Sequence, residues 1–363
     1  MQQRMLPYLR CPVTRSPLSL AQVQTSESRH EHAGDGNVVI REAILYAAQD
    51  WFFPVIDGIP RLTVEAFADY HDFFTKHLPD YVTRRQQLES KYAGLIAYVK
   101  KKNKRTRESF SREWGFYNYQ EDRTWDAGKE EMLQCFLQET GESTGSLRGK
   151  TVLDAGCGNG HLDMLIAQQG AIVLAMDLSR SIERAYRQNK HPDAWYIQGD
   201  VQFPPVAFSL FDIVHSSGVL HHTNNTELSF GCLAPCVKPG GKLSVWLYHP
   251  RRDLLHRFFN VARVFISPLP SGLQYFLLSI TIFPVSYLIK KIKGNRQNHR
   301  EMMIDILDWF TPEFRREHLP DEVACWFLKR EFVAVQVTTT GAFGFNMMGK
   351  KPALAERPIS RPE

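Results

Sequence analysis

Thr151-Val-Leu-Asp-Ala-Gly-Cys-Gly-Asn-Gly160 is the stretch of sequence that decides the fold. It begins as a short apolar run at 151–155, ends in three alternating glycines and passes into an amphipathic segment at 161–169. This order predicts a buried parallel strand, a tight turn and the N-terminus of a helix. Because the three glycines carry no Cβ atom, a ligand can lie against the backbone of the turn.

Acidic residues mark the ends of the strands that we expect beside this turn. Asp154 lies at the end of the first apolar run, and a second run leads into Asp177, 177 − 154 = 23 residues further on. A third run is followed by Asp200. Open α/β sheets bind their ligands at the carboxyl ends of the strands. An acid about 20 residues beyond the turn is also where a ribose-binding carboxylate is expected.

The order of the glycines distinguishes between cofactors. A dinucleotide-binding turn has the pattern Gly-x-Gly-x-x-Gly, which would place its last glycine at position 161, where His161 stands. The observed pattern is Asp-x-Gly-x-Gly-x-Gly, and with it the chain resembles the class I S-adenosylmethionine-dependent methyltransferases. Asp177 is similar to the ribose-binding acid of that family and Asp200-Val201 to its adenine-binding pair. The stretch 211–222 resembles its fourth strand, and 237–242 the turn into its fifth.

This resemblance covers about 108–250 and implies a cofactor, S-adenosyl-L-methionine, and a set of residues that bind it. Asp177 would accept two hydrogen bonds from the ribose hydroxyls, and Asp200 one from the adenine amino group. The glycines would make room for the methionine end. The complete implied set is Asp154, Gly156, Cys157, Gly158, Gly160, Asp177, Leu178, Asp200, Val201 and Ser217.

The resemblance also completes the fold. Apolar runs that alternate with helical segments predict an α/β protein with a doubly wound, parallel sheet. The family adds a strand pair near the C-terminus, which gives a seven-stranded Rossmann-like methyltransferase sheet with one antiparallel edge strand. The seven strands are expected at 151–155, 171–176, 194–198, 212–216, 242–248, 332–338 and 343–349.

Residues 1–63 form a small β-rich domain that resembles the Trm112-like zinc-ribbon family in its Cys-Pro opening and its Pro-x-x-Asp-Gly-Ile-Pro ending. A structural zinc needs four soft ligands. Cys11 is present, but Thr14, Tyr46 and Gln49 stand where further thiolates would be, so we expect no metal. The domain is expected to pack on the aromatic run at 51–53, with a turn at 34–36. Similar domains act as interaction modules, which implies a protein partner or self-association.

Residues 64–107 are expected to form a polar, helical, basic linker that ends in Lys100-Lys-Lys-Asn-Lys-Arg-Thr-Arg107. The run is either a solvated helix end or a patch that binds nucleic acid or acidic lipid. Aromatic residues are not interleaved with the charges, which favours the solvated helix and disfavours nucleic acid. The aromatic stretch at 110–119 either packs on the core or covers the cofactor, with Trp114 and Trp125 as candidate contacts.

The methyltransferase domain is expected at 108–350, followed by a flexible tail at 351–363. Its fifth and sixth strands are separated by a segment too long for one crossover helix. Within it, the apolar stretch at 273–289 approaches transmembrane length and is followed by lysines at 290, 291 and 293. The chain must return to finish the same sheet, which argues against a single span. We therefore expect a helical cap insertion at about 250–325, of which 253–293 could contact a membrane surface.

Methyl transfer needs both reactants held in line, so cofactor residues are better determined than catalytic ones. The fourth strand lacks the Asn/Asp-Pro-Pro-Tyr cluster that polarises amine and amide nitrogens, which favours an oxygen or carbon nucleophile. Such acceptors need a base that works near neutral pH. His222 is the favoured candidate, before His221 and His249, although each could equally line the pocket or end a helix.

Composition agrees with a globular enzyme. The chain has 363 residues, is 43% hydrophobic and carries a formal charge of +5, and its six cysteines contain no CxxC pair, as expected in a reducing compartment. Its first twenty residues include three arginines and no signal-peptide core, so we expect a cytoplasmic protein, with peripheral contact at the membrane as an open alternative. The favoured function is methylation of a small or lipid-like acceptor. An RNA or protein methyltransferase and a non-catalytic cofactor-binding module stay open.

Overall fold

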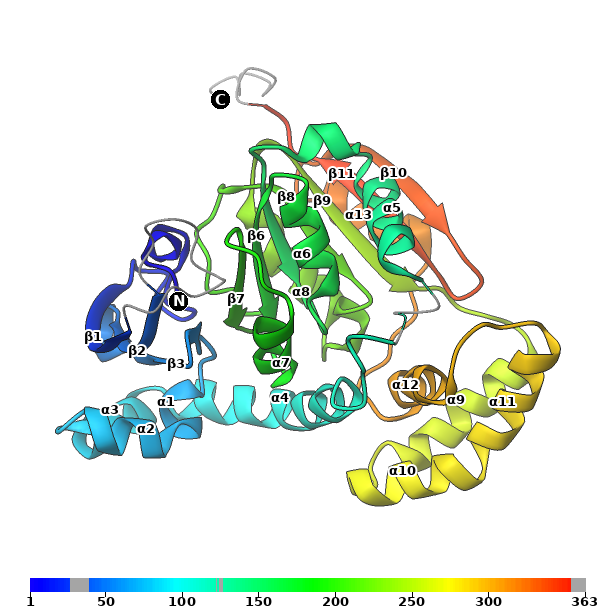
Figure 1. Ribbon diagram of the computed structural model, residues 1–363, viewed down its shortest axis with the longest axis horizontal. Coiled ribbons are helices and arrows are strands. Elements are labelled where there is room, and N and C mark those ends of the chain that lie inside the picture. Colours follow the sequence, from blue (N-terminus) through cyan, green and yellow to red (C-terminus); the bar gives the residue numbers. More distant parts are fainter. Residues whose placement is uncertain (27–38, 122, 124–126, 354–363) are drawn as a thin grey trace, which may run out of the picture.

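A seven-stranded sheet forms the centre of the computed structural model, which describes residues 1–26, 39–121, 123 and 127–353 (Figure 1). The strands lie in the order β10-β11-β9-β8-β5-β6-β7, and β5 to β9 run parallel. Their bounds are β5 Thr151–Ala155, β6 Ile172–Asp177, β7 Ala194–Gln198, β8 Phe211–Ser217, β9 Val237–Tyr248, β10 Val333–Thr340 and β11 Gly344–Lys350. The predicted α/β sheet of seven strands is confirmed.

The expected antiparallel edge strand is corrected in one respect. The antiparallel strand is β11, and it lies inside the sheet, between β9 and the edge strand β10. Seven consecutive residue pairs join β11 to β9, from Gly344 opposite Tyr248 to Lys350 opposite Lys242. The short connection after β10 turns the chain back between its two neighbours, so the last strand in the sequence is not the last in space.

Alternate residues of each central strand enter two different cores, as period-2 strands covered on both faces require. Val152 and Val173 pack with Phe136 of α5, Ile166 of α6 and Ile182 of α7. The residues next to them in the strands face the opposite core, which includes α8 and α13. The helix bounds are α5 Lys129–Thr140, α6 His161–Gln168, α7 Ser181–Gln188, α8 Thr226–Leu233 and α13 Pro320–Leu328.

The N-terminal unit is a four-stranded antiparallel sheet that lies beside β7 (Figure 1). It comprises β1 Ser19–Ser26, β2 Val39–Tyr46, β3 Phe52–Ile56 and β4 Ile59–Pro60. The backbone N–H of Leu62 donates to the carbonyl of Gln198 at 2.8 Å, so the unit continues the edge of the large sheet. Trp51, Phe52 and Phe53 are fully buried, as expected. The turn predicted at 34–36 lies outside the described residues.

Helices connect this unit to the sheet and extend beyond it. α1 Ala66–Asp69, α2 His71–His77 and α3 Tyr81–Lys91 precede the long α4, Ala93–Glu113, which crosses beneath the sheet (Figure 1). The segment between β9 and β10 begins with α9 Leu254–Ile266, α10 Ser271–Ile280, α11 Ile282–Ile292 and α12 His299–Phe310. These four helices, called the cap here, share a small core of their own that includes Leu278, Leu307 and Phe310.

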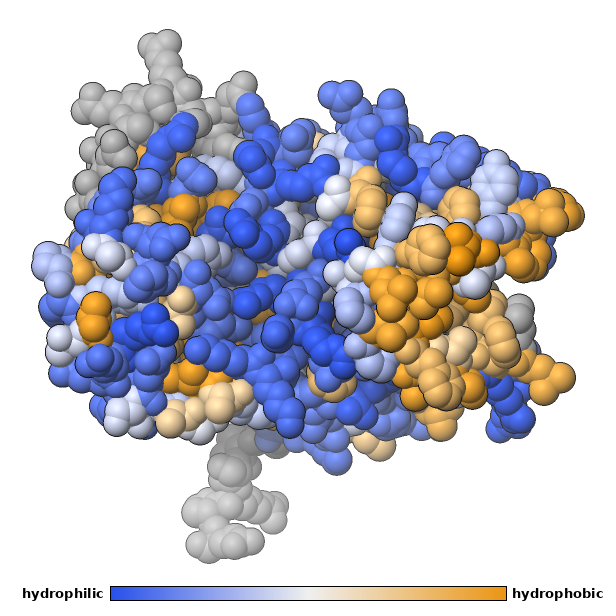
Figure 2. All heavy atoms as spheres, turned by 90° about the horizontal axis from the view of Figure 1, so that it is seen from below, coloured by the Kyte–Doolittle hydropathy of each residue, from blue (hydrophilic) through white to orange (hydrophobic). Residues whose placement is uncertain are grey.

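Among the described residues, no single helix has both the length and the apolarity to cross a membrane. The pair α10 and α11 meets both criteria only when taken together, and it is bent by 48° at its break. The cap presents a broad apolar face to solvent, visible as the orange area of Figure 2.

A buried charge network joins the centre of the sheet to α5. His215 of β8 lies with Nε2 2.7 Å from Glu139 Oε2 and Nδ1 3.4 Å from Asp154 Oδ1. Burial alone would lower the pKa of His215, but hydrogen bonds and charge interactions with the two acids raise it to about 10. Asp154 is therefore a partner of His215 within the sheet in this structure.

We predict that Glu139→Gln lowers the free energy of unfolding by about 3–5 kcal/mol at pH 7, because it breaks a buried ion pair. The folded-state pKa of His215 lies above its ordinary value of 6.5, so this stabilisation is complete below that pH and disappears as pH rises through about 10. Urea unfolding at pH 7 and at pH 10 measures the effect. A deficit in the variant that stays equal at both pH values would contradict the ion pair.

Candidate active site

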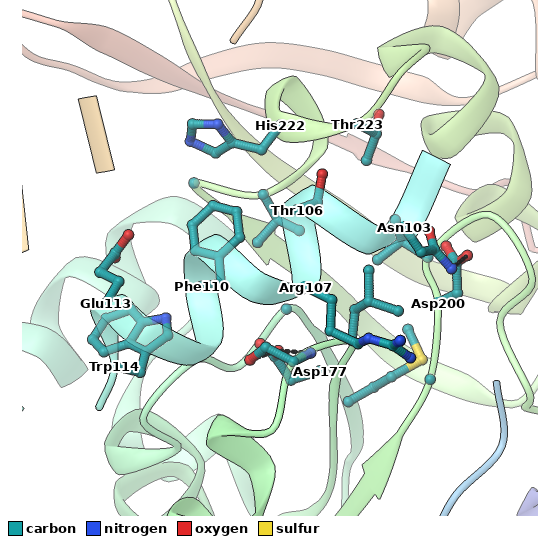
Figure 3. Close-up of a pocket in the computed structure, with 18 of the residues that line it drawn as sticks. Asn103, Thr106, Arg107, Phe110, Glu113, Trp114, Asp177, Asp200, His222 and Thr223 are labelled. Atoms are coloured by element: carbon teal, nitrogen blue, oxygen red, sulfur yellow. Dashed lines mark hydrogen bonds between the residues drawn. The ribbon is translucent and has the colours of Figure 1, made fainter. Parts of the chain in front are cut away.

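One pocket lies where β5, β6, β7 and β8 end, between the glycine turn and α4 (Figure 3). It brings together residues that the sequence separates by more than 200 positions, from Lys102 on α4 to Asp308 on α12. The predicted site residues that line it are Gly156, Asp177, Leu178, Asp200, Val201, Ser217 and His222. The predicted position at the carboxyl edge of the sheet is thus where the structure forms its pocket.

Two glycines of the turn have no room for a side chain. Gly156 has φ of +104°, and a Cβ there would lie 2.2 Å from a methyl group of Val219. Gly158 has φ of +55°, and its Cβ would lie 2.8 Å from the indole of Trp114. Glycine is required at both positions because L side chains rarely adopt these angles and a neighbour already occupies the space. Trp114 therefore packs on the turn and lines the pocket, and its role as a cover for the cofactor stays a prediction.

Asp177 closes the glycine turn from the neighbouring strand. Its Oδ2 accepts a hydrogen bond from the Gly158 N–H at 2.9 Å, and its Oδ1 accepts two from Ser179, from N–H and from Oγ–H, at 2.7 Å each. Burial raises the pKa of Asp177, and these three hydrogen bonds oppose the rise. A carboxylate offers about four acceptor positions. About one therefore remains for a ligand, where the sequence suggested two bonds to a ribose.

Asp200 is held by α4. Its Oδ1 accepts from the Gln202 N–H at 2.9 Å, and its Oδ2 accepts from Asn103 Nδ2 at 3.0 Å. The ammonium group of Lys102 forms an ion pair with the same Oδ2, and both partners are buried. A buried carboxylate is tolerated only when it is paired in this way. The pair anchors α4 across the ends of β6 and β7.

The contribution of α4 is what the sequence analysis missed. One face of this helix lines the pocket, and its members recur every three or four residues: Lys102, Asn103, Thr106, Arg107, Phe110 and Glu113. Lys100, Lys101 and Lys104 lie on the exposed side, as the solvated-helix interpretation expected. The spacing of Asn103, Thr106 and Phe110 is an amphipathic signal that could have identified the inner face.

Glu113 is the least expected residue of this face. Its side chain is fully buried, lines the pocket and has no hydrogen-bond partner at either oxygen among the described residues. Burial, and then repulsion from Asp308, Asp305 and Asp177, hold the pKa of Glu113 well above its usual range. An unpaired carboxyl group in such a place resists ionisation.

His222 faces Glu113 across the pocket from the 3₁₀ turn Leu220–His222 (Figure 3). Its Nδ1 lies 3.0 Å from the carbonyl oxygen of Phe314, to which an Nδ1–H group can donate a hydrogen bond. Nε2 lies 3.4 Å from Asp308 Oδ1, without a hydrogen bond among the described residues. Burial opposes ionisation of Asp308, but His222 and a 2.6 Å hydrogen bond from Tyr248 hold its pKa below the usual range.

The other predicted residues lie outside this pocket. His221 is buried against Tyr248, and burial lowers its pKa well below the usual range. His249 is at the exposed end of β9, where its ring nitrogens face the carbonyls of Pro250 and Gly341. Four further predicted residues do not line the pocket: Asp154, Cys157, Gly158 and Gly160. Trp125 falls outside the described residues.

Comparison with known proteins supports the enzyme class. The family model described as "Methyltransferase domain" matches residues 153–245. The chain is 35% identical over 96 residues to the malonyl-acyl-carrier protein O-methyltransferase of Pectobacterium atrosepticum, covering 26% of this chain and 38% of the relative. It is 33% identical over 101 residues to the ubiquinone biosynthesis O-methyltransferase of Coxiella burnetii, covering 27% of this chain and 43% of the relative. The chain thus spans less than half the length of these curated relatives.

A solved structure, the magnesium protoporphyrin IX methyltransferase from Synechocystis with bound S-adenosylhomocysteine, aligns with 68% of this chain and 97% of its own. Its TM-score is 0.41 and its sequence identity 16%. The family match identifies residues 153–245 as a methyltransferase domain. This match includes the glycine turn from which the sequence indicated S-adenosylmethionine as the cofactor.

We predict that Glu113→Gln stabilises the protein at pH 8 by about 1–3 kcal/mol and has little effect at pH 4, because the buried acid no longer resists ionisation. A folded-state pKa above the unfolded value means that stability falls as pH rises above the unfolded pKa. Chemical unfolding at both pH values tests this, with Glu108→Gln on the exposed face of α4 as the control. Destabilisation of equal size at both pH values would show that Glu113 is ionised and paired.

Proposed function

We propose that the protein is an S-adenosylmethionine-dependent methyltransferase that methylates an oxygen, or failing that a carbon, of a small or lipid-like acceptor. The observation that carries the proposal is the meeting of Asp177, Asp200 and His222 in one pocket at the end of the glycine turn. The first two can hold a nucleoside, and the third can accept a proton. Both relatives are named O-methyltransferases, which supports oxygen as the methylated atom.

The residues present fit the cofactor. Asp177 keeps about one acceptor position for a ribose hydroxyl, and Asp200 keeps about one for the adenine amino group, since each carboxylate already accepts three interactions. Gly156 lines the pocket together with Val219, whose side chain packs on it. When bound, the cofactor supplies an electrophilic methyl group on a sulfonium.

The protein itself contributes in two ways: it positions the two reactants, and it accepts one proton. Confinement of two reactants in line can supply about 7–11 kcal/mol of the barrier. We assign to His222 Nε2 the proton that the acceptor loses, since Nδ1 is committed to the Phe314 carbonyl. The Asp308 carboxylate, 3.4 Å away, would stabilise the imidazolium that forms.

A small acceptor is better supported than RNA. Two cations of the basic run point inward and are already paired, Lys102 with Asp200 and Arg107 with Asp69. Neither is then available for phosphate without breaking a contact that holds the pocket. Turnover of the cofactor with a low-molecular-weight acceptor would also exclude the third alternative, a non-catalytic binding module.

We predict that Asp177→Ala weakens S-adenosylmethionine binding about 10- to 150-fold, the loss of one charge-assisted hydrogen bond of about 1.5–3 kcal/mol. Isothermal calorimetry measures the affinity, and Asp193→Ala, a surface acid paired with Arg4, is the control. No binding of NAD is expected. Unchanged affinity in Asp177→Ala, or tight binding of NAD to the wild type, would contradict the cofactor assignment.

We predict that His222→Ala lowers turnover about 100- to 10,000-fold, the usual contribution of a general base, and leaves cofactor affinity nearly unchanged. Asp308→Asn should shift the pH profile of turnover rather than abolish activity, because it removes the charge that stabilises the imidazolium. His249→Ala is the matched control, since His249 lies outside the pocket. Near-normal turnover of His222→Ala would mean that confinement alone carries the reaction.

A further inference from the structure

We propose that α9, α10 and α11 dock on the surface of an anionic lipid bilayer. The docking is argued from the cap alone. Its consequence, that the acceptor reaches the pocket from the membrane, rests on the proposed function.

The first observation is a concentration of exposed apolar side chains. Of the 21 large hydrophobic residues exposed in the described chain, 12 lie between Leu254 and Ile292. We call these 12 the apolar patch. Leu254, Phe265 and Ile292 are 81%, 72% and 77% exposed. Figure 2 shows apolar side chains gathered on the cap, while the rest of that face is mainly hydrophilic. An apolar area of this extent on a soluble surface marks an interaction site.

The patch is not an unfinished core. The inner sides of the same helices are already packed, with Leu278 buried against Met303, Leu307 and Phe310 of α12. The exposed residues lie on the outer sides, where nothing in the fold of the described chain covers them. The helices are thus apolar on both sides, as segments are when one side meets protein and the other meets lipid.

The charge of the segment that carries the apolar patch indicates which partner binds there. The sequence contains no Asp or Glu from position 254 to 300, where about five would be expected at the chain's average frequency. The same stretch contains seven cations. Lys290, Arg296 and Arg300 form ion pairs with acids outside it, and Arg263 donates to backbone carbonyls. No ion pair with an acid is found among the described residues for the other three: Arg257, Lys291 and Lys293. A second copy of this chain would bring the same positive charge to the interface. An anionic bilayer supplies both the apolar depth and the opposite charge.

The position of the patch connects it to the pocket through one helix. α12 packs Leu307 and Phe310 against α9, α10 and α11 and turns Asp308 into the pocket. α12 also contacts α4, where Thr311, just after it, hydrogen-bonds Ser109 at 2.6 Å between their hydroxyl oxygens. α12 therefore lies between the docked helices and the pocket, and a lipid-like acceptor at the bilayer surface would reach the pocket past this helix. Surface docking needs no span, which agrees with the 48° bend between α10 and α11.

Vesicle flotation of the full chain without cofactor tests the docking. We expect the protein to float with vesicles of phosphatidylcholine and phosphatidylglycerol, and to bind at least tenfold more weakly to phosphatidylcholine alone or in 0.5 M salt. We expect carbonate at pH 11 to release it. Failure to float with either vesicle, or retention after carbonate, would overturn the proposal of surface docking.

Variants identify the surface. The double variant Phe265→Ser with Phe276→Ser removes two exposed apolar side chains from the patch. The double variant Arg257→Glu with Lys293→Glu reverses two exposed positive charges. Each double variant should weaken vesicle binding at least tenfold. Val82→Ser with Leu328→Ser is the matched control, because both residues are 61% exposed but lie outside the patch. Equal flotation of all variants would overturn the assignment. Self-association that the patch variants abolish, without flotation of the wild type, would instead identify an interface between copies.

Calorimetry of S-adenosylmethionine binding accompanies each variant. We expect unchanged affinity, which shows that the variants fold and separates the two proposals. Loss of flotation with intact cofactor binding is the supporting result. If the wild type floats with vesicles but binds no cofactor, the proposed function is contradicted and the docking is still supported.

Discussion

The hydrogen bond between the Asp177 carboxylate and the Gly158 N–H is the constraint on which the site depends. It joins the end of β6 to the turn after β5, so the turn has one shape although it contains three glycines. The N–H groups of Gly156 and Cys157 donate to the Met176 carbonyl, at 2.7 and 3.1 Å, and complete the closure. Backbone groups that would otherwise be unsatisfied at a buried turn are thereby paired. Trp114 and Val219 can then pack directly on the bare glycines.

α4 converts this turn into a pocket and joins the three parts of the molecule. At its middle, Lys102 and Asn103 hold Asp200, and Asn103 also donates to Glu65 beside the N-terminal unit at 3.0 Å. At its end, Arg184 of α7 donates to the backbone carbonyls of Trp114, Gly115 and Tyr117 at 2.6–2.7 Å. A single helix is therefore fixed by contacts to the N-terminal unit, the sheet and the cap. A change in its position would alter the pocket and the cap together.

What the sequence could predict follows from the range of the interactions concerned. The strands and the glycine turn depend on local patterns, in which an apolar run ends at a glycine or an acid, and all seven strands lie within a few residues of the predicted bounds. The Lys102–Asp200 and His222–Asp308 pairs join residues 98 and 86 positions apart, and no local pattern encodes them. The sequence of a lysine run is the same whether its side chains are solvated or one of them pairs with a buried acid. The order of β10 and β11 likewise depends on pairing with β9, which the sequence of the hairpin does not contain.

The pocket and the outer surface of the cap carry opposite charges and therefore favour ligands of opposite charge. Asp177, Glu113 and Asp308 face one pocket. Burial raises the pKa of both Glu113 and Asp177, and repulsion from Asp308 and Asp177 raises that of Glu113 further. A cationic ligand relieves that repulsion, and a neutral one does not. A sulfonium cofactor is a cation, and the thioether left after methyl transfer is not. The same acids thus favour binding of the substrate form over the product form, while the acid-free stretch from 254 to 300 favours an anionic surface on the outside.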